Sequence, residues 1–524
     1  MLTRALKNSR SRPRLVSSDR EREVVTAISR LAFCNPFTPE RLRLERQVLG
    51  EAFTPFDVVW HAQTDAAGAN PNVPGIAAKA LELAEEMRAR LAGPQPAASR
   101  EELELYRALV LYLLYNRYQL RLFEGIHGRD GEGRPGAFGF YREFLADLER
   151  YLDPPALGEG RLDPAHLFAC CFQIRRAFHF TFRSIVGGSM PAAQLRERVW
   201  QSIFTHDLQR YQRALYRTMG DITTLVTGPS GTGKELVARA IGHSRYIPFD
   251  AKALRFRESW AESFYPLNLS ALSPTLIESE LFGHRRGAFT GAVADRTGWF
   301  EVCPPLGTVF LDEIGETEPA IQVKLLRVLE TRTFQRLGET RSRRFQGKVV
   351  AATNRDLARE MQEERFRADL YYRLCSDLLV TPSLRERIAA APEELSNLIL
   401  FLAERAVGEE LAAEVAREAE EWISAHLGSG YPWPGNVREL AQCVNNVLIR
   451  REYRPASSGA SDVRARLAEE ILAGGLTAEE VLRRYCTLVY ARTGSYEEAA
   501  RHLDLDRRTV KSRVDPDLLT ELRG

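Results

Sequence analysis

The chain has 524 residues, of which 44% are apolar and 27% charged, and its net charge at pH 7 is +2. This length suggests about three domains, and the composition is typical of water-soluble globular chains. Because the net charge is close to zero, any DNA-binding surface must be local. The longest apolar run, residues 108–115, is too short to cross a bilayer, and the basic N-terminus lacks the apolar core of a signal peptide. We therefore expect a cytoplasmic protein with no membrane partner.

Residues 1–180 have the pattern of an all-α region. Ser99 and Glu102 form a capping-box pattern, in which each side chain can accept a hydrogen bond from the N–H of the other residue, and apolar residues at helical spacing follow. An earlier helix is expected between Gly75 and Gly93. The region lacks the strand–helix alternation of a receiver domain. The aromatic-rich stretch 168–182 is expected to be core rather than ligand pocket. We predict a helical regulatory domain whose signal and sign of action the sequence does not indicate.

Residues 183–455 have a different pattern, in which short β-rich runs alternate with helices. The clearest runs are 222–228, 308–315 and 348–354. Alternation of this kind favours a parallel sheet with crossover helices, so this region is predicted to be an α/β domain.

The first of these runs ends in a glycine-rich loop, and a helix follows. Glycines let backbone N–H groups close around phosphate oxygens, and a helix N-terminus favours negative charge. Lys234 would supply a positive charge for the β- and γ-phosphates. The alternative is a plain glycine-rich turn, which the strand before it and the helix after it disfavour. The predicted nucleotide-binding residues of the loop are Gly228, Pro229, Ser230, Gly231, Thr232, Gly233, Lys234 and Glu235.

The second run ends in two carboxylates, Asp312 and Glu313. Phosphoryl transfer needs a group that holds Mg²⁺ and a group that polarises the attacking water. We predict that Asp312 holds the metal ion and Glu313 acts on the water. Acidic residues also follow strands in ordinary turns, but the upstream phosphate-binding pattern favours the catalytic interpretation.

Residues 287–292 read GAFTGA, and this hexapeptide makes a family resemblance specific. Residues 183–455 resemble the AAA+ domain of sigma-54-dependent activators, also called bacterial enhancer-binding proteins. The resemblance implies a P-loop ATPase with a helical lid, working with Mg²⁺ and ATP in a ring homo-oligomer, a hexamer. It also implies that a loop tip contacts sigma-54 through Gly287, Ala288, Phe289, Thr290, Gly291 and Ala292.

Five more positions follow the family pattern, and their roles come from the resemblance alone. It implies that Asn268 is a switch that pairs with Glu313, and that Asn354 senses the γ-phosphate. It further implies arginine fingers that act across a subunit boundary and a sensor arginine in the lid, namely Arg367, Arg373 and Arg438. The sequence departs from the family at Pro229, where glutamate is usual, and in two longer stretches, 206–221 and 243–264.

Residues 465–524 are predicted to be an all-α helix-turn-helix domain, after a linker near 454–462. Capping-box patterns at Thr477 and Ser495 open two helices, and Asp506 can cap a third. The segment resembles the Fis-type domain, although Asp504 stands where glycine is common. The alternative is a solvated charged helix. The predicted DNA-binding residues are Arg507, Arg508, Thr509, Lys511, Ser512 and Arg513.

The resemblance as a whole implies a sigma-54-dependent transcription activator. Such a protein binds upstream enhancer DNA and uses ATP hydrolysis to remodel the sigma-54 RNA polymerase holoenzyme into the open complex. The competing hypothesis is a non-transcriptional AAA+ remodeller or chaperone whose tail helices serve oligomerisation. The GAFTGA segment and the basic third helix favour the activator.

Overall fold

A computed structural model of the chain describes residues 15–55, 70–93, 98–127, 137–152, 163–455, 467–468, 470–472 and 474–523. They fall into two compact units, Met1–Leu448 and Ile449–Gly524. The predicted fold class is confirmed: a helical N-terminal region, a central α/β domain and a helical C-terminal region follow in chain order. The predicted linker lies mostly outside the described residues. In the part of the chain that the structure describes, no helix is both long and apolar enough to cross a membrane.

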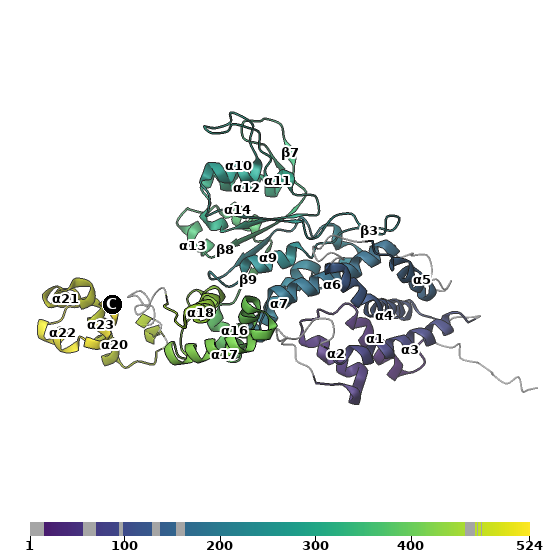
Figure 1. Cartoon of the computed structure of the whole chain (residues 1–524), viewed down its shortest axis with the longest axis horizontal. Helices are drawn as coiled ribbons and strands as arrows, with labels where there is room; N and C mark the ends of the chain where they lie inside the picture. The colour runs from purple at the N-terminus through teal and green to yellow at the C-terminus, as the bar shows by residue number, and fades with distance from the viewer. Residues whose placement is uncertain are drawn as a thin grey trace, which may run out of the picture. The chain divides into compact units, whose positions relative to one another are not determined.

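The N-terminal helices pack against one another (Figure 1). Their buried apolar residues belong to one core. The predicted capping box is confirmed, because Ser99 N donates to Glu102 Oε2 at 2.9 Å and Glu102 N donates to Ser99 Oγ at 3.2 Å. The elements are α1 (Asp19–Leu31), α2 (Pro39–Leu49), the 3₁₀ turn η1 (Gly50–Ala52), α3 (Val73–Leu91), α4 (Arg100–His127), α5 (Tyr141–Leu152) and α6 (Pro164–Ser184).

A five-stranded parallel sheet forms the centre of the next region, with strand order β4-β5-β8-β1-β9. Its strands are β1 (Thr224–Thr227), β4 (Phe264–Asn268), β5 (Thr308–Asp312), β8 (Lys348–Thr353) and β9 (Asp377–Val380). The whole of β8 is buried, as expected for a central strand with helices on both faces. Because all five strands run the same way, their carboxyl ends meet at one edge.

Helices and two small hairpins surround this sheet. The helices are α7 (Met190–Phe204), α8 (Leu208–Arg213), η3 (Leu215–Arg217), α9 (Lys234–Gly242), α10 (Pro274–Phe282), α11 (Trp299–Val302), η4 (Ile314–Glu316), α12 (Pro319–Thr331), α13 (Leu357–Gln362) and α14 (Ala368–Leu374). The hairpins pair β2 (Phe249–Asp250) with β3 (Arg255–Phe256) and β6 (Thr333–Phe334) with β7 (Arg343–Arg344). The lid helices follow as α15 (Leu384–Ala390), α16 (Glu394–Val407), α17 (Glu409–His426) and α18 (Asn436–Arg450).

The longer stretch 243–264 joins the central α/β domain to the N-terminal helices. Its β2–β3 hairpin puts Phe249 and Phe256 into the N-terminal core, where the ring centroids of Phe256 and Phe172 lie 4.4 Å apart. Phe138 N also donates to the Leu254 carbonyl at 2.8 Å. The N-terminal helices and the central α/β domain therefore share apolar packing within one compact unit.

The C-terminal unit contains α20 (Ala478–Thr493), α21 (Tyr496–Leu503), α22 (Arg507–Arg513) and α23 (Pro516–Arg523). The predicted caps are confirmed, since the side chains of Thr477, Ser495 and Asp506 each accept from the backbone of the helix they open. Asp504 has a φ of 52°, a left-handed conformation that aspartate tolerates better than most residues and that explains the usual glycine.

Candidate functional site

The glycines of the loop after β1 are required by close backbone packing. Gly228 has a φ of 141°, and a Cβ there would lie 2.2 Å from Thr381 Oγ1. Gly231 has a φ of 77°, and a Cβ there would lie 2.2 Å from the Gly435 carbonyl oxygen of the lid. Side chains at these positions would therefore push the loop away from β9 and from the lid.

Lys234, the first residue of α9, lies buried beneath this loop. Its Nζ donates to the carbonyl oxygens of Gly228 at 3.0 Å and Pro229 at 3.2 Å. Burial lowers the pKa of Lys234, and the charges of Glu313 and Asp312 oppose that shift. The lysine is thus held within the loop, close enough to both carboxylates to feel their charge.

Asp312 and Glu313 stand half-buried at the end of β5. Burial, together with the charge of Glu313, raises the pKa of Asp312. Glu313 has a φ of 55°, a conformation that costs about 1–3 kcal/mol in a non-glycine residue and is common at functional sites. Its Oε2 accepts from the backbone N–H of Asn354 at 3.2 Å, which fixes the carboxylate at the edge of the sheet.

The two predicted asparagines lie at neighbouring strand ends. Asn268 pairs in register with Asp312, and Asn354 directly follows β8. The Asn268 Oδ1 accepts from Ser270 N at 2.9 Å and Ser270 Oγ at 2.8 Å. The structure therefore brings both asparagines to the carboxylate edge, while the Asn268 side chain is engaged by Ser270.

Lid residues close the other side of the cleft. Arg438 Nη1 donates to Ser230 Oγ at 3.2 Å, and Asn436 Nδ2 donates to the Ser230 carbonyl at 2.9 Å. The cleft has a volume of about 380 Å³, within the range of small-molecule sites. It is lined by loop residues 230–235, both carboxylates and Arg438.

Sequence reasoning missed part of this cleft. Arg183 and Ile185 at the end of α6 line it, as do Leu398, Leu402 and Arg405 of α16. None belongs to a short motif, and their positions depend on how the lid and α6 pack on the sheet. The clustering of apolar residues opposite the phosphate-binding loop provides a surface suited to a flat base.

Arg367 and Arg373 do not line the cleft of their own chain. Both are exposed at the ends of α14. Arg367 makes a two-pronged ion pair with Asp369, at 3.0 and 2.7 Å, and Arg373 donates to the Leu329 carbonyl at 3.0 and 3.1 Å. An arginine that acts on the nucleotide of a neighbouring subunit must lie outside the cleft of its own chain, and both arginines meet that condition.

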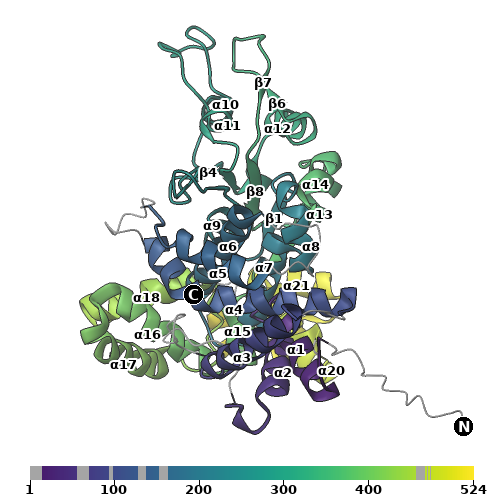
Figure 2. The same ribbon diagram turned by 90° about the vertical axis from the view of Figure 1, so that its right-hand side faces the viewer.

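Residues 287–292 form a tight turn between α10 and α11. Gly287 N donates to the Ala292 carbonyl at 2.8 Å, and Gly287 and Gly291 have φ values of 81° and 99°. Thr290 is exposed, whereas Phe289 is half-buried with its ring centroid 5.0 Å from that of His284. Figure 2 shows this loop extending away from the sheet beside the loop between β6 and β7.

Helix α22 presents part of its predicted DNA-binding set to solvent. Arg507, Arg508 and Lys511 are exposed, and Val510 is buried in the unit's core. Arg507 forms an ion pair with Glu497 at 3.2 Å. The hydroxyl of Thr509 donates to Asp506, and Ser512 Oγ donates to the Thr509 carbonyl at 3.0 Å. Arg513 is half-buried. Arg508 and Lys511 are therefore the side chains best placed to meet a partner.

Residues 203–379 match the family model of the sigma-54 interaction domain. This chain carries a sigma-54 interaction domain. The Nif-specific regulatory protein of Azotobacter vinelandii is 46% identical over 230 residues, 44% of this chain and 40% of that protein. The anaerobic nitric oxide reductase transcription regulator NorR of Klebsiella pneumoniae is 40% identical over 274 residues, 51% and 45% of the two chains. The transcriptional regulatory protein ZraR of Salmonella typhimurium is 37% identical over 301 residues, 56% and 63% of the two chains.

The alignments span about half the length of these relatives. Each relative is a regulatory protein, and NorR and ZraR are regulators of transcription by name. A non-transcriptional remodeller or chaperone is therefore not favoured.

Proposed function

We propose that this protein is a cytoplasmic sigma-54-dependent transcription activator. In this proposal, the C-terminal unit binds upstream enhancer DNA. The AAA+ domain hydrolyses ATP in a hexameric ring, and the loop at 287–292 contacts sigma-54 in the RNA polymerase holoenzyme to drive the open complex. One observation carries the proposal. A single parallel sheet holds the glycine-rich loop and the Asp312–Glu313 pair, and the region that matches the sigma-54 interaction domain also contains the exposed GAFTGA turn.

The residues of the cleft fit Mg-ATP. Backbone N–H groups of the loop and Lys234 suit phosphate oxygens, and the half-buried carboxylate of Asp312 suits Mg²⁺, which would neutralise phosphate charge when bound. Glu313 is held by the backbone of Asn354 where it can orient a water molecule. Turnover depends on positioning and charge. A shift of Asn354 relative to Glu313 would therefore connect the state of the γ-phosphate to the position of the Glu313 carboxylate at the sheet edge.

The loop at 287–292 gives the first test. Thr290→Ala should leave ATP hydrolysis intact, because the exposed threonine is on a turn outside the nucleotide cleft. It should reduce activated transcription from a sigma-54 promoter to background. The measurement is ATP turnover alongside open-complex formation with purified sigma-54 holoenzyme. Thr340→Ala, an exposed threonine before β7, is the matched control and should retain both activities. A Thr290→Ala variant that activates transcription as well as that control would refute the contact role.

Helix α22 gives the second test. Arg508→Ala and Lys511→Ala should each weaken DNA binding, by about 1–3 kcal/mol where the side chain contacts a base. A phosphate contact would instead lower the salt slope by about 1. Binding is measured by fluorescence anisotropy over a salt series, with duplexes selected by the wild-type protein from a random pool. Arg483→Ala on α20 is the control, because Arg483 is exposed but pairs with Asp515. If both variants bind DNA with the same affinity as the control, α22 is a solvated charged helix and does not contact DNA.

A further inference from the structure

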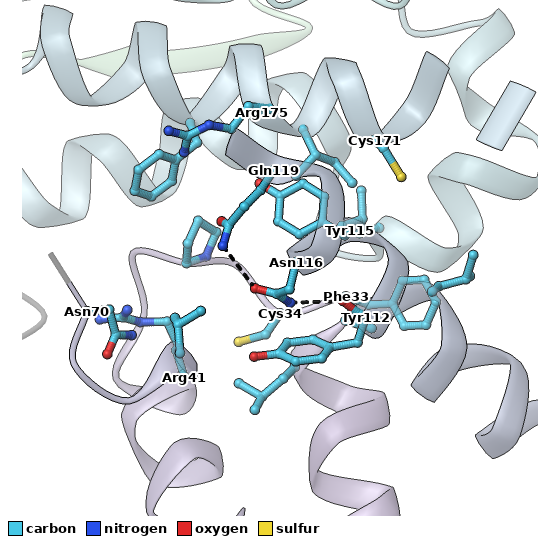
Figure 3. Close-up of a pocket in the computed structure, with 18 of the residues that line it drawn as sticks. Phe33, Cys34, Arg41, Asn70, Tyr112, Tyr115, Asn116, Gln119, Cys171 and Arg175 are labelled. Atoms are coloured by element: carbon cyan, nitrogen blue, oxygen red, sulfur yellow. Dashed lines mark hydrogen bonds between the residues drawn. The ribbon is translucent and has the colours of Figure 1, made fainter. Parts of the chain in front are cut away.

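A cavity of about 280 Å³ lies among the N-terminal helices. Its wall comes from the end of α1, from α2, α4 and α6, and from α7 through Trp200. Figure 3 shows lining side chains that include Phe33, Tyr112 and Arg175. Aromatic rings of Phe33, Tyr112, Tyr115, Phe178 and Trp200 line the cavity, together with aliphatic and polar side chains. An apolar cavity of about 150 Å³ accepts benzene, so this cavity can hold one ring with a small polar substituent. The stretch 168–182, expected to be core, is mostly buried, but part of it forms this wall.

One positive charge in the wall lacks a carboxylate partner. Arg175 is 3% exposed, and among the described residues no ion pair includes it. Its Nε is buried without a hydrogen bond, and its guanidinium carbon lies 4.5 Å from the ring centroid of Phe123. Burying a guanidinium in this way is costly unless an anion compensates it.

The carboxylate in the wall, Glu45, is already engaged elsewhere. Its two oxygens accept from Asn70 Nδ2 at 2.7 Å and Asn72 Nδ2 at 3.2 Å, and Oε1 lies 3.5 Å from Arg41. Burial raises the pKa of the Cys34 thiol to about 11, so this group stays neutral. Burial also raises the pKa of the Tyr115 hydroxyl, although a hydrogen bond with Arg175 opposes the shift. The cavity therefore presents an excess of positive charge to an occupant.

Of the two amides in this part of the wall, Asn116 is well paired, since its Nδ2 donates to the Tyr112 carbonyl at 2.9 Å, and only Gln119 is loosely held. Gln119 Nε2 lies 3.5 Å from Asn116 Oδ1, at the outer limit of a hydrogen bond. Figure 3 marks this contact with a dashed line. The Gln119 amide can therefore turn to an occupant at little cost. Aromatic walls, a buried guanidinium and an adaptable amide form the few convergent polar groups in an apolar pocket that define a small-ligand site.

We propose that this cavity binds a small organic acid with a single aromatic ring. The carboxylate would be received by Arg175, whose planar fork matches carboxylate geometry, with Gln119 as a further donor. The ring would lie against Tyr112, Tyr115 and Phe178. This binding claim does not depend on the proposed transcriptional function.

Two helices connect the cavity to the nucleotide cleft. The middle of α6 lines the cavity through Arg175 and Phe178, and its C-terminal end lines the cleft through Arg183 and Ser184. Helix α7 lines the cavity through Trp200, and the same helix lines the cleft nearer its start. A ligand that favours one position of these helices will shift nucleotide affinity by its difference in affinity for the two states. This second claim rests on the nucleotide site.

Calorimetry on the full chain without nucleotide tests the binding claim. Benzoate and phenylacetate are the probes, and benzamide is the neutral analogue. We expect both acids to bind and benzamide to bind at least about tenfold more weakly, because a hydrogen bond to a charged group is lost. Arg175→Met should abolish acid binding and Arg175→Lys should retain part of it. Arg100→Met, which removes a 93% exposed arginine on α4, should bind as wild type.

Two outcomes overturn the site: neither acid binds, or benzamide binds as well as benzoate. If Arg175→Met fails to fold, Ala32→Leu gives an independent test, because it fills the cavity without removing a charge. A folded Ala32→Leu variant with wild-type affinity would also refute the site. The coupling claim is tested by the affinity for ATPγS with and without saturating benzoate. Equal affinities, with benzoate bound, would refute coupling while leaving the binding site and the ATPase proposal intact.

Discussion

Lys234→Ala should weaken ATP binding by about 100-fold or more and leave no measurable turnover. The side chain is buried, and its Nζ donates to two carbonyl oxygens of the loop that is proposed to hold the phosphates. Removing one member of a buried charge pair typically costs about 3–5 kcal/mol, and about 1.4 kcal/mol corresponds to each tenfold in affinity. The measurement is the affinity for a fluorescent ATP analogue, followed by the steady-state ATPase rate.

The control for this variant is Lys252→Ala. Lys252 is exposed after β2 and does not line the cleft, so its replacement should change neither affinity nor rate. Thermal melting of both variants shows whether the loop substitution has harmed the fold. A folded Lys234→Ala protein that binds and hydrolyses ATP normally would remove the P-loop assignment, and with it the proposed energy source.

The nucleotide-binding edge was predictable because parallel-sheet topology constrains it. Once residues 224–227, 308–312 and 348–353 are recognised as parallel strands, the residues after them must meet at one edge. The sequence therefore predicts that Lys234, Asp312 and Asn354 lie close together. Caps were predictable for a similar reason, since a capping box is a local hydrogen-bond pattern that does not depend on tertiary packing.

Other features depend on long-range packing and carry no local signal. The stretch 243–264 has an irregular sequence, yet its hairpin places Phe249 and Phe256 in the N-terminal core. The stretch 206–221, longer than is usual in the family, forms the short helix α8 and the turn η3. The contribution of Arg405 to the cleft likewise depends on the lid's position. Only the packed structure identifies these residues.

The N-terminal cavity could not be predicted from the sequence, for a physical reason. Arg175 lies in an aromatic helical stretch where core is the usual outcome, and most of its neighbours on α6 are indeed buried. The neighbouring Arg176 is also buried without an ion pair, but its guanidinium donates to the carbonyls of His243 and Arg245. Among the described residues Arg175 has neither an ion pair nor such carbonyl acceptors, which is a property of its surroundings and not of its sequence. Unbalanced buried charge is therefore a better guide to this site than residue type.

Arg373→Ala should lower the ATPase rate by about 10³–10⁵-fold, the range expected when a finger that stabilises transition-state charge is removed. Arg373 is exposed at the end of α14 and lies outside its own chain's cleft, so its effect requires a neighbouring subunit. The rate is measured as a function of protein concentration, which separates a loss of catalysis from a loss of assembly. Arg359→Ala, which removes a 72% exposed arginine on α13, should hydrolyse ATP as wild type.

Mixing two inactive variants tests whether the finger acts in trans. Glu313→Ala should retain nucleotide binding but lose turnover, because only the group that orients the water is removed. In a mixed ring, an Arg373→Ala subunit supplies an intact Glu313, and a Glu313→Ala neighbour supplies an intact Arg373. Interfaces of this kind contain both groups, so the mixture should recover ATPase activity that neither variant has alone. If the finger served its own chain, every site would lack one group and no mixing ratio would restore turnover. A mixture of Lys234→Ala with Glu313→Ala is the matched comparison, and it should stay inactive because both substitutions fall in the same subunit's cleft.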